Sequence, residues 1–279
     1  MKDERKTFLI TGGANGIGKS IANALLRNGL NVCVADSDAP ALDDFFPAEI
    51  TPQTRERFFG INVNLASIDG CINSIEKAAQ RFGGIDGVFN NAAIGASSIR
   101  DDAEKNLPTI EEISPEIWDR FFNTNVRAPM VITRAALPYM RSRCWGRIVN
   151  ITTSYRTMLR VLPYGATKSA LESMSAVWAK ELAGTGITVN VLVPGGPTDT
   201  QLIADGSGWP RNEMLAPSIM VLPALWLISD QANEVTGMRI TAKKWDNLVG
   251  PQEALKKSAR LIGWPELAAA PASWQQAQE

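Results

Sequence analysis

The sequence TGGANGIG at residues 11–18 joins a short apolar run to an amphipathic helical pattern. The apolar run, KTFLITG at 6–12, has the length and composition of a buried strand, and residues 16–29 carry apolar side chains at helical spacing. Glycines at such a turn let the backbone approach a pyrophosphate closely, which the helix N-terminus then binds. The spacing here is GxxxGxG rather than the commoner GxGxxG, so a purely structural turn remains the alternative interpretation.

Strand-like and helix-like segments alternate along the rest of the chain. The predicted strands are residues 6–12, 31–36, 57–64, 84–93, 146–153, 186–195 and 237–246. The predicted helices are residues 16–29, 67–82, 115–140 and 164–183. Most strands are continuous apolar runs, which is typical of strands buried on both faces. The sequence therefore predicts an α/β fold with a doubly wound parallel sheet and helices on both faces.

The chain is predicted to hold one domain over residues 1–250, because no internal repeat and no linker interrupts this part. Residues 251–264 predict one short amphipathic helix, and residues 265–279 have the composition of a loose tail. We therefore expect residues 251–279 to form a C-terminal extension.

Composition excludes several classes of function. The 279 residues are 45% hydrophobic and carry a net charge of −1, which predicts no nucleic-acid partner and no membrane surface contact. The N-terminus lacks the apolar run of a signal peptide, and the longest apolar stretch, at 219–228, is too short to span a bilayer. A cytoplasmic location is the resulting expectation.

The chain contains no histidine, and its cysteines, Cys33, Cys71 and Cys144, form no CxxC pair. We expect reduced cysteines that pack in the protein and no metal site. Without histidine, zincin-type metal sites and Ser–His–Asp hydrolases are excluded. Any acid–base chemistry must then use a group whose pKa is shifted far from its usual value.

The stretch YGATK at 164–168 supplies such a group. Tyr164 and Lys168 are one helical turn apart and share a face. A free tyrosine has a pKa near 10, so forming its phenolate at pH 7 costs roughly 4 kcal/mol. A nearby ammonium, together with a positively charged nicotinamide ring, could supply much of that stabilisation. Taken alone, the pair is equally compatible with an ordinary helix N-terminus.

The second predicted strand ends in Asp36, where a carboxylate can accept hydrogen bonds from an adenosine ribose. Ser37 and Asp38 follow, with no arginine or lysine to meet the extra phosphate of NADP. This favours NAD as the cofactor, with NADP less suited to the site. A solvated aspartate at the end of a strand is the alternative.

These features and four more occur in one order along the chain: TGGANGIG, Asp36, NNAA (90–93), Asn125, NITT (150–153), YGATK and PGGPTDT (194–200). In this order they resemble the short-chain dehydrogenase/reductase family, from about Lys6 to Thr241. The resemblance implies a single Rossmann-type domain with a seven-stranded parallel sheet. It also implies a homotetramer or homodimer assembled through the helices near 115–143 and 164–183.

The resemblance implies a role for each catalytic residue. Tyr164 would be the general acid–base, and Lys168 would lower its pKa and bind the nicotinamide ribose. Asn125 would support a proton-relay water. The hydroxyl that binds the substrate carbonyl would come from Thr153, with Ser154 as the alternative.

The resemblance also implies contacts to the cofactor. They would come from Gly12, Asn15, Gly16, Ile17, Gly18, Asp36, Asn64, Asn90, Ala92, Tyr164, Lys168, Pro194, Gly195 and Thr198. Thr200 is the alternative to Thr198. The chain departs from the family pattern at Ala93, in NNAA, and at Asn64, where an aspartate is usual. These departures indicate a divergent branch with its own substrate.

The expected reaction is reversible hydride transfer between NAD and a secondary alcohol or ketone. The alternatives are a catalytically silent NAD-binding sensor, and an epimerase or lyase that uses the cofactor transiently. Residues 199–216 would form the substrate loop, with Trp209 over the substrate. Arg156 and Arg160 leave an acidic substrate open, while an apolar or cyclic alcohol fits equally well. Residues 97–113 are expected to be a surface feature.

Overall fold

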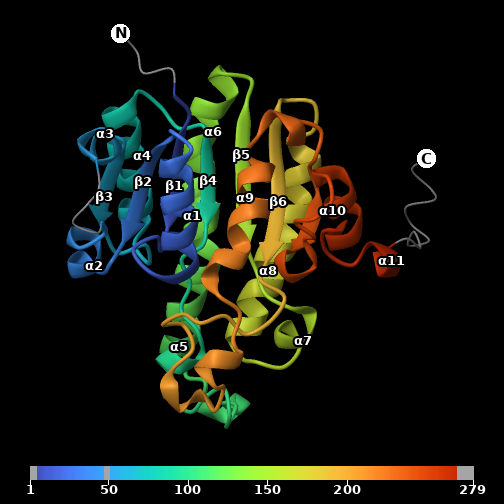
Figure 1. Ribbon diagram of the computed structural model, residues 1–279. Coiled ribbons are helices and arrows are strands. Elements are labelled where there is room, and N and C mark those ends of the chain that lie inside the picture. Colours follow the sequence, from blue (N-terminus) through green and yellow to red (C-terminus); the bar gives the residue numbers. More distant parts are fainter. Residues whose placement is uncertain (1–4, 47–50, 269–279) are drawn as a thin grey trace, which may run out of the picture.

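The computed structural model describes residues 5–46 and 51–268 (Figure 1). Its strands form one eight-stranded sheet in the order β3-β2-β1-β4-β5-β6-β7-β8. The strands are β1 (Thr7–Thr11), β2 (Asn31–Asp36), β3 (Phe58–Asn62), β4 (Gly87–Asn90), β5 (Gly146–Ile151), β6 (Ile187–Val193), β7 (Met238–Thr241) and β8 (Ala259–Leu261). Strands β1 to β7 are parallel, and β8 runs antiparallel to β7.

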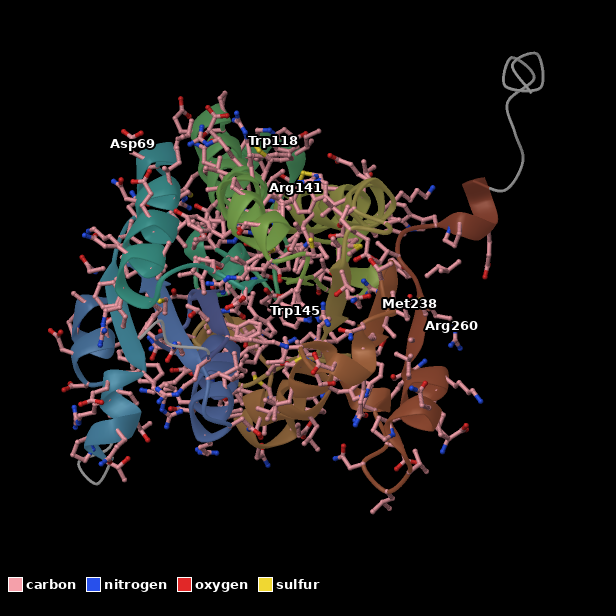
Figure 2. The ribbon with its side chains drawn as sticks, turned by 90° about the horizontal axis from the view of Figure 1, so that it is seen from above. Asp69, Trp118, Arg141, Trp145, Met238 and Arg260 are labelled. Carbon is pink, nitrogen blue, oxygen red and sulfur yellow. The ribbon has the colours of Figure 1, made fainter. Side chains whose placement is uncertain are left out.

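Helices cover both faces of the sheet, as the view in Figure 2 shows. They are α1 (Gly16–Arg27), α2 (Ala39–Asp43), α3 (Pro52–Glu56), α4 (Ile68–Phe82), α5 (Pro115–Phe122), α6 (Ala128–Ser142), α7 (Tyr155–Met158), α8 (Tyr164–Glu181), α9 (Val221–Leu227), α10 (Pro251–Ser258) and α11 (Pro265–Ala268). Short 3-10 turns lie at Ala96–Ser98, Ile110–Glu112, Asp205–Ser207, Arg211–Glu213, Pro217–Met220, Asp230–Ala232 and Ala242–Lys244.

The two faces of the sheet bury separate apolar clusters, which explains the continuous apolar strands. On β1, Phe8 and Ile10 pack with α1 and α9, while Leu9 between them packs with α4 and α6. Each successive side chain of a strand points to the opposite face, so both sets must be apolar. The predicted α/β fold with helices on both faces is confirmed.

The chain departs from the predicted elements at its C-terminal end. Residues 251–264 were expected to form one helix, but α10 ends at Ser258 and Ala259 turns to an extended conformation. The next residues add β8 to the edge of β7, so the sheet has eight strands rather than seven. Burial of Ala259 and Ile262 holds this strand in place. Residues 251–263 therefore continue the domain. Of the predicted tail at 265–279, Pro265–Ala268 form helix α11, and residues 269–279 lie outside the described residues.

The long helix predicted over 115–140 is present, with a π-helical segment inside it. Helix α5 ends at Phe122, the π segment spans Asn123–Arg127, and α6 follows with Pro129 near its start, while the backbone remains right-handed helical at both junctions. Pro129 has no N–H to donate to the preceding turn, and it lies where the helical hydrogen-bond pattern changes. The π segment holds the buried Asn125. Within the described residues, no helix has the length and apolar character to cross a membrane.

Candidate active site

One cavity of about 970 Å³ lies at the carboxyl ends of the parallel strands, where open α/β sheets bind their ligands. It runs from the glycine turn after β1 to the start of α8. The predicted site residues that line it are Gly12, Asn15, Gly16, Ile17, Asp36, Asn64, Ala92, Thr153, Tyr164, Lys168, Pro194, Gly195 and Thr198. The alternatives Ser154 and Thr200 line it as well.

Three predicted site residues do not line the cavity: Gly18, Asn90 and Asn125. The Asn90 side chain is buried behind the cavity wall, where Nδ2 donates to Thr133 Oγ1 at 3.1 Å and Asn150 Oδ1 at 2.7 Å. The Asn90 amide therefore links strand β4 to its neighbours rather than lining the cavity, and its ribose contact stays a prediction. The next residue, Asn91, reaches the cavity instead.

The glycine turn lines the cavity before α1 and packs closely against its neighbours. Gly12 has a φ of +62°, and a Cβ on it would lie 2.8 Å from the Ala92 Cα. A Cβ on Gly18 would lie 2.3 Å from the Gly12 carbonyl oxygen, so Gly18 allows α1 to pack closely on the turn. The side chain of Asn15, the N-cap residue of α1, makes no capping hydrogen bond. The first N–H groups of this helix can therefore bind an anion such as a pyrophosphate.

Two carboxylates stand at the far end of the same turn. Asp36 Oδ2 accepts from the Ala14 N–H at 2.9 Å, and Asp36 Oδ1 accepts from the Asp38 N–H at 3.1 Å. Asp38 Oδ2 accepts from Asn15 Nδ2 at 2.9 Å. Both aspartates line the cavity. The two carboxylates at this end of the cavity can accept hydrogen bonds from ribose hydroxyls and would repel a phosphate. Asp38 was not among the predicted site residues.

Tyr164 and Lys168 meet on the first turns of α8, as their spacing predicts. The Lys168 side chain is buried, its Nζ donates to the Ile151 carbonyl at 2.8 Å, and Nζ lies 5.7 Å from the centroid of the Tyr164 ring. Burial lowers the pKa of Lys168 to about 8, so the amine is mostly charged at pH 7.

The pKa of the Tyr164 phenol is raised, whereas the resemblance implied a lowered one. Burial first, and then the negative charge of Glu104, raise its pKa, while a hydrogen bond to the Thr153 side chain acts in the opposite direction. In the protein alone, Tyr164 therefore stays protonated at neutral pH. The expected lowering of this pKa is not present before a positive ligand charge enters the site.

The two candidate hydroxyls at the end of β5 are in different environments. Ser154 Oγ caps α7 by accepting from the Thr157 N–H at 3.1 Å, and this residue is exposed. Thr153 is half-buried and lies within hydrogen-bonding reach of Tyr164. Of the two, the Thr153 hydroxyl is therefore the one placed beside the phenol.

Asn125 holds two segments together behind the site. Its Nδ2 donates to the Ile94 carbonyl and to Thr167 Oγ1, both at 3.0 Å, and its Oδ1 accepts from the Ile94 N–H at 2.9 Å. The asparagine thus joins the loop after β4 to α8. Because Thr167 precedes Lys168, this contact helps to set the position of the lysine.

One wall of the cavity comes from two segments that are far apart in the sequence. Ser98, Glu104 and Leu107, in the stretch predicted to be a surface feature, line the cavity together with Trp209. The two segments lie side by side below the sheet (Figure 1), and Ser97 Oγ donates to the Leu202 carbonyl at 2.8 Å. Residues 97–113 lie largely on the surface, as predicted, and part of this stretch also covers the site.

Comparison with known proteins gives consistent matches. The short chain dehydrogenase family matches residues 6–209. A 3-oxoacyl-[acyl-carrier-protein] reductase of Thermotoga maritima is 28% identical over 256 residues, which cover 86% of this chain and 97% of the relative. A D-beta-hydroxybutyrate dehydrogenase of Cupriavidus necator is 33% identical over 196 residues, which cover 68% of this chain and 70% of the relative.

A solved structure shows the same arrangement of elements. The crystal structure of a 3-ketoacyl-(acyl-carrier-protein) reductase from Brucella melitensis, complexed with NADH, superposes with a TM-score of 0.69 at 25% sequence identity. The match covers 83% of this chain and 93% of that chain.

Proposed function

The chain belongs to the short-chain dehydrogenase family, and on that premise we propose that it is an oxidoreductase that transfers a hydride between a nicotinamide cofactor and a secondary alcohol or ketone. One observation carries the proposal. A single cavity joins the glycine turn and Asp36 to the Tyr164–Lys168 pair, so a dinucleotide held at one end would reach the proton-transfer group at the other.

The side chains of this site divide the work of the reaction. A nicotinamide cofactor supplies or accepts the hydride when it is bound. Tyr164 holds the proton that moves to or from the substrate oxygen, and the Thr153 hydroxyl donates a hydrogen bond to the same oxygen. Lys168, fixed on the Ile151 carbonyl, keeps a positive charge near the phenol as the proton leaves.

The proposed cofactor is NAD rather than NADP. Asp36 and Asp38 both face the end of the cavity nearest the second strand. Their two negative charges suit ribose hydroxyls and oppose a phosphate at that position. Gly12, Gly16 and the N-terminus of α1 would hold the pyrophosphate.

The substrate we propose is an uncharged alcohol or ketone. Glu104 lies close enough to Tyr164 to raise the pKa of the phenol, so it disfavours a substrate carboxylate near the reacting oxygen. Arg160 interacts with Glu104 and so offsets part of its charge. Trp209 and Leu107 give the same wall apolar surface, which suits a hydrocarbon or ring.

The proposal is tested by following NADH at 340 nm while a panel of secondary alcohols and ketones is offered to wild type, Tyr164→Phe and Tyr139→Phe. Tyr139, on α6, packs in the apolar cluster of α4 and α6, does not line the cavity, and serves as the matched control. We expect Tyr164→Phe to lose at least about 100-fold in kcat while NADH binding is kept, because the proton donor alone is removed. Tyr139→Phe should behave like wild type.

Other results would point to the alternatives. Tight NADH binding with no turnover of any compound would favour a sensor. Product formation without net change in NADH would favour an epimerase or lyase. Equal turnover by wild type and Tyr164→Phe would contradict the role given to the tyrosine.

A further inference from the structure

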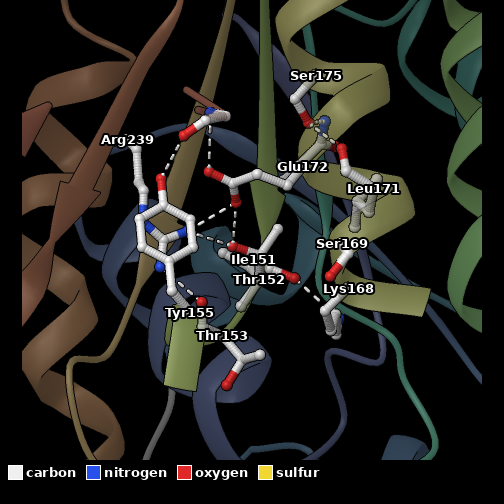
Figure 3. Close-up of polar contacts among 12 residues, drawn as sticks. Ile151, Thr152, Thr153, Tyr155, Lys168, Ser169, Leu171, Glu172, Ser175 and Arg239 are labelled. Atoms are coloured by element: carbon white, nitrogen blue, oxygen red, sulfur yellow. Dashed lines mark hydrogen bonds and ion pairs between the residues drawn. The ribbon is translucent and has the colours of Figure 1, made fainter. Parts of the chain in front are cut away.

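A buried ion pair lies behind the catalytic end of β5, outside the set of residues used so far (Figure 3). Arg239 Nη1, from β7, donates to Glu172 Oε2, from α8, at 2.7 Å. The two side chains are 7% and 0% exposed, so the pair is almost wholly removed from water. Neither residue lines the cavity.

The arginine also binds the segment that carries the substrate hydroxyl. Its Nη2 donates to the Thr153 carbonyl at 2.6 Å, and its Nη1 donates to Thr152 Oγ1 at 3.1 Å. Thr152 Oγ1 donates in turn to Glu172 Oε2 at 2.8 Å. The peptide group of Thr153 is therefore fixed by a charged donor at the point where β5 ends and the chain turns into α7.

The same pair reaches the C-terminal part of the chain. The Gly263 N–H donates to Glu172 Oε1 at 3.4 Å, and the Tyr155 hydroxyl donates to the Gly263 carbonyl at 2.8 Å. The Arg239 guanidinium lies 4.2 Å from the centroid of the Tyr155 ring. The residues after β8 thus hold α7 against the ion pair.

A buried ion pair of this kind is a weak source of stability. Removing two charges from water costs about as much as their attraction returns, and apolar pairs of similar volume are often as stable. The geometry of the contacts is more informative, because a planar guanidinium offers several donors in fixed directions. Here these donors go to the Thr153 carbonyl, Thr152 and Glu172 together.

We propose that Arg239 and Glu172 are positioning residues that hold the end of β5 and α7 so that the Thr153 hydroxyl faces Tyr164. This inference rests on the proposed function. Neither residue touches the reacting atoms, and both act through the backbone of Thr153 and through Gly263. Through Gly263, the residues after β8, to which the sequence assigns no role, would help to hold the proposed active site in place.

The test separates position from stability with two variants, Arg239→Met and Arg239→Met/Glu172→Met. The single variant leaves Glu172 charged and unpaired, so we expect its Tm to fall by about 5 °C or more. The double variant has no unpaired charge, and we expect its Tm within about 3 °C of wild type. Its kcat should nevertheless stay about 10- to 100-fold low, with the Kd for NADH unchanged, since the Thr153 carbonyl has lost its donor.

The matched control is Arg147→Met/Asn233→Leu. Arg147 is as deeply buried as Arg239, lies at the opposite end of β5 and pairs with the Asn233 side chain. If any change to a buried arginine of this sheet lowers kcat, the control will show the same loss. We expect the control to keep the kcat of wild type at temperatures below its Tm.

Hydrogen exchange gives a readout that needs no substrate. In the double variant, the amides of residues 153–158 should exchange about tenfold faster than in wild type, with those of α1 unchanged. A double variant with wild-type kcat and wild-type exchange would overturn the inference. If wild type itself turns over no alcohol or ketone, the proposed function fails, and the exchange rates alone decide whether the ion pair positions this segment.

Discussion

A protonated phenol at Tyr164 suits the reductive direction of the proposed reaction. Burial and the charge of Glu104 raise the pKa of this residue, so the proton is in place at neutral pH. A site that begins with its proton on the tyrosine can donate it to a carbonyl oxygen at once. The reverse reaction needs the phenolate first, which forms more readily as pH rises.

We therefore predict different pH dependences for the two directions. Between pH 6 and about 7, where Lys168 is mostly charged, kcat for ketone reduction should stay nearly constant, whereas kcat/KM for alcohol oxidation should rise about tenfold per pH unit while Tyr164 is mostly protonated. Initial rates in both directions across this range check the prediction. An oxidation rate that does not change with pH would contradict it.

A second prediction concerns the buried amine of Lys168, whose pKa falls from 10.5 to about 8 on burial. Between these values the unfolded chain binds more protons than the folded protein, so folding is favoured increasingly as pH rises. We expect the free energy of unfolding of wild type, minus that of Lys168→Met, to rise from pH 8 to pH 9.5. The whole contribution is of the order of 3 kcal/mol.

Urea unfolding at several pH values measures this difference. The subtraction is needed because burial raises the pKa of Cys33 and Cys71, and these groups lower stability as pH rises. Both thiols are present in wild type and variant, so their effect cancels. A difference that falls with pH would show that the amine is not desolvated.

The third prediction tests cofactor choice at Asp36. Asp36→Ala should weaken NADH binding about tenfold and leave NADPH binding unchanged or improved, because one of two repelling carboxylates is removed. Tryptophan-to-nicotinamide energy transfer measures both affinities. Asp69→Ala, on the exposed start of α4, is the control. Tighter NADPH than NADH binding in wild type would contradict the assignment of NAD.

At the scale of elements, the loop between β6 and α9 is held as a folded unit. Arg211 Nη1 pairs with Asp199 at 2.9 Å and Arg211 Nη2 pairs with Asp205 at 2.7 Å. The same guanidinium donates to the Thr200 carbonyl at 3.0 Å and the Ile203 carbonyl at 2.7 Å. The Arg211 side chain thus links residues 199–205 to the turn that carries Arg211 itself.

The fourth prediction follows from this anchor. Arg211→Ala should raise KM for the substrate several-fold and speed cleavage by chymotrypsin after Leu202 or Leu215, while the Kd for NADH stays within about twofold, because only the substrate wall is loosened. Arg27→Ala, on the exposed end of α1, is the control. Unchanged KM and unchanged proteolysis would show that the loop needs no such anchor.

The sequence predicted the central elements well and the peripheral ones poorly, for physical reasons. Strands buried on both faces can be predicted directly from continuous apolar runs. The glycines of TGGANGIG likewise indicate a tight strand-to-helix turn. Glu104 and Leu107 belong to no such pattern. They reach the cavity only because residues 97–113 pack against the loop near Leu202, which is a tertiary contact. Strand β8 was missed since residues 251–264 share one helical pattern.

The same contrast holds within the site. Tyr164 and Lys168 are one helical turn apart, so local geometry alone brings them together. Asn90 stands in a recognisable motif, but its amide turns toward Asn150, and no local rule indicates which of two adjacent asparagines faces the cavity. Arg239 and Glu172 lie far apart in the chain, so their pairing depends on the completed sheet.

At the scale of the whole molecule, the helical face formed by α5, α6 and α8 leaves large apolar side chains exposed. Trp118 stacks on Phe122 and is 40% exposed, Met130 is 38% exposed and Val177 is 58% exposed. Apolar side chains gathered on one face are typical of a protein interface. We propose that two or four copies of the chain associate through these helices.

The fifth prediction tests this association. Trp118→Glu should reduce the mass in solution, measured by light scattering after size-exclusion chromatography, because a buried charge at the contact opposes assembly. Leu248→Glu, at a residue that is 96% exposed and far along the chain, is the control. A wild-type mass equal to one chain would overturn the proposal.

The hydrogen bonds of Gly263 have a consequence for the synthesis of the protein. Glu172 and Gly263 are 91 positions apart, and the cofactor half of the sheet is complete long before the ribosome reaches Gly263. A domain generally folds as a unit, so the contacts of Gly263 can form only when translation is almost complete. A nascent chain would thus align α7 and the end of β5 only near the end of translation. A message cut short before Gly263 would encode a protein that lacks this support for the Thr153 segment.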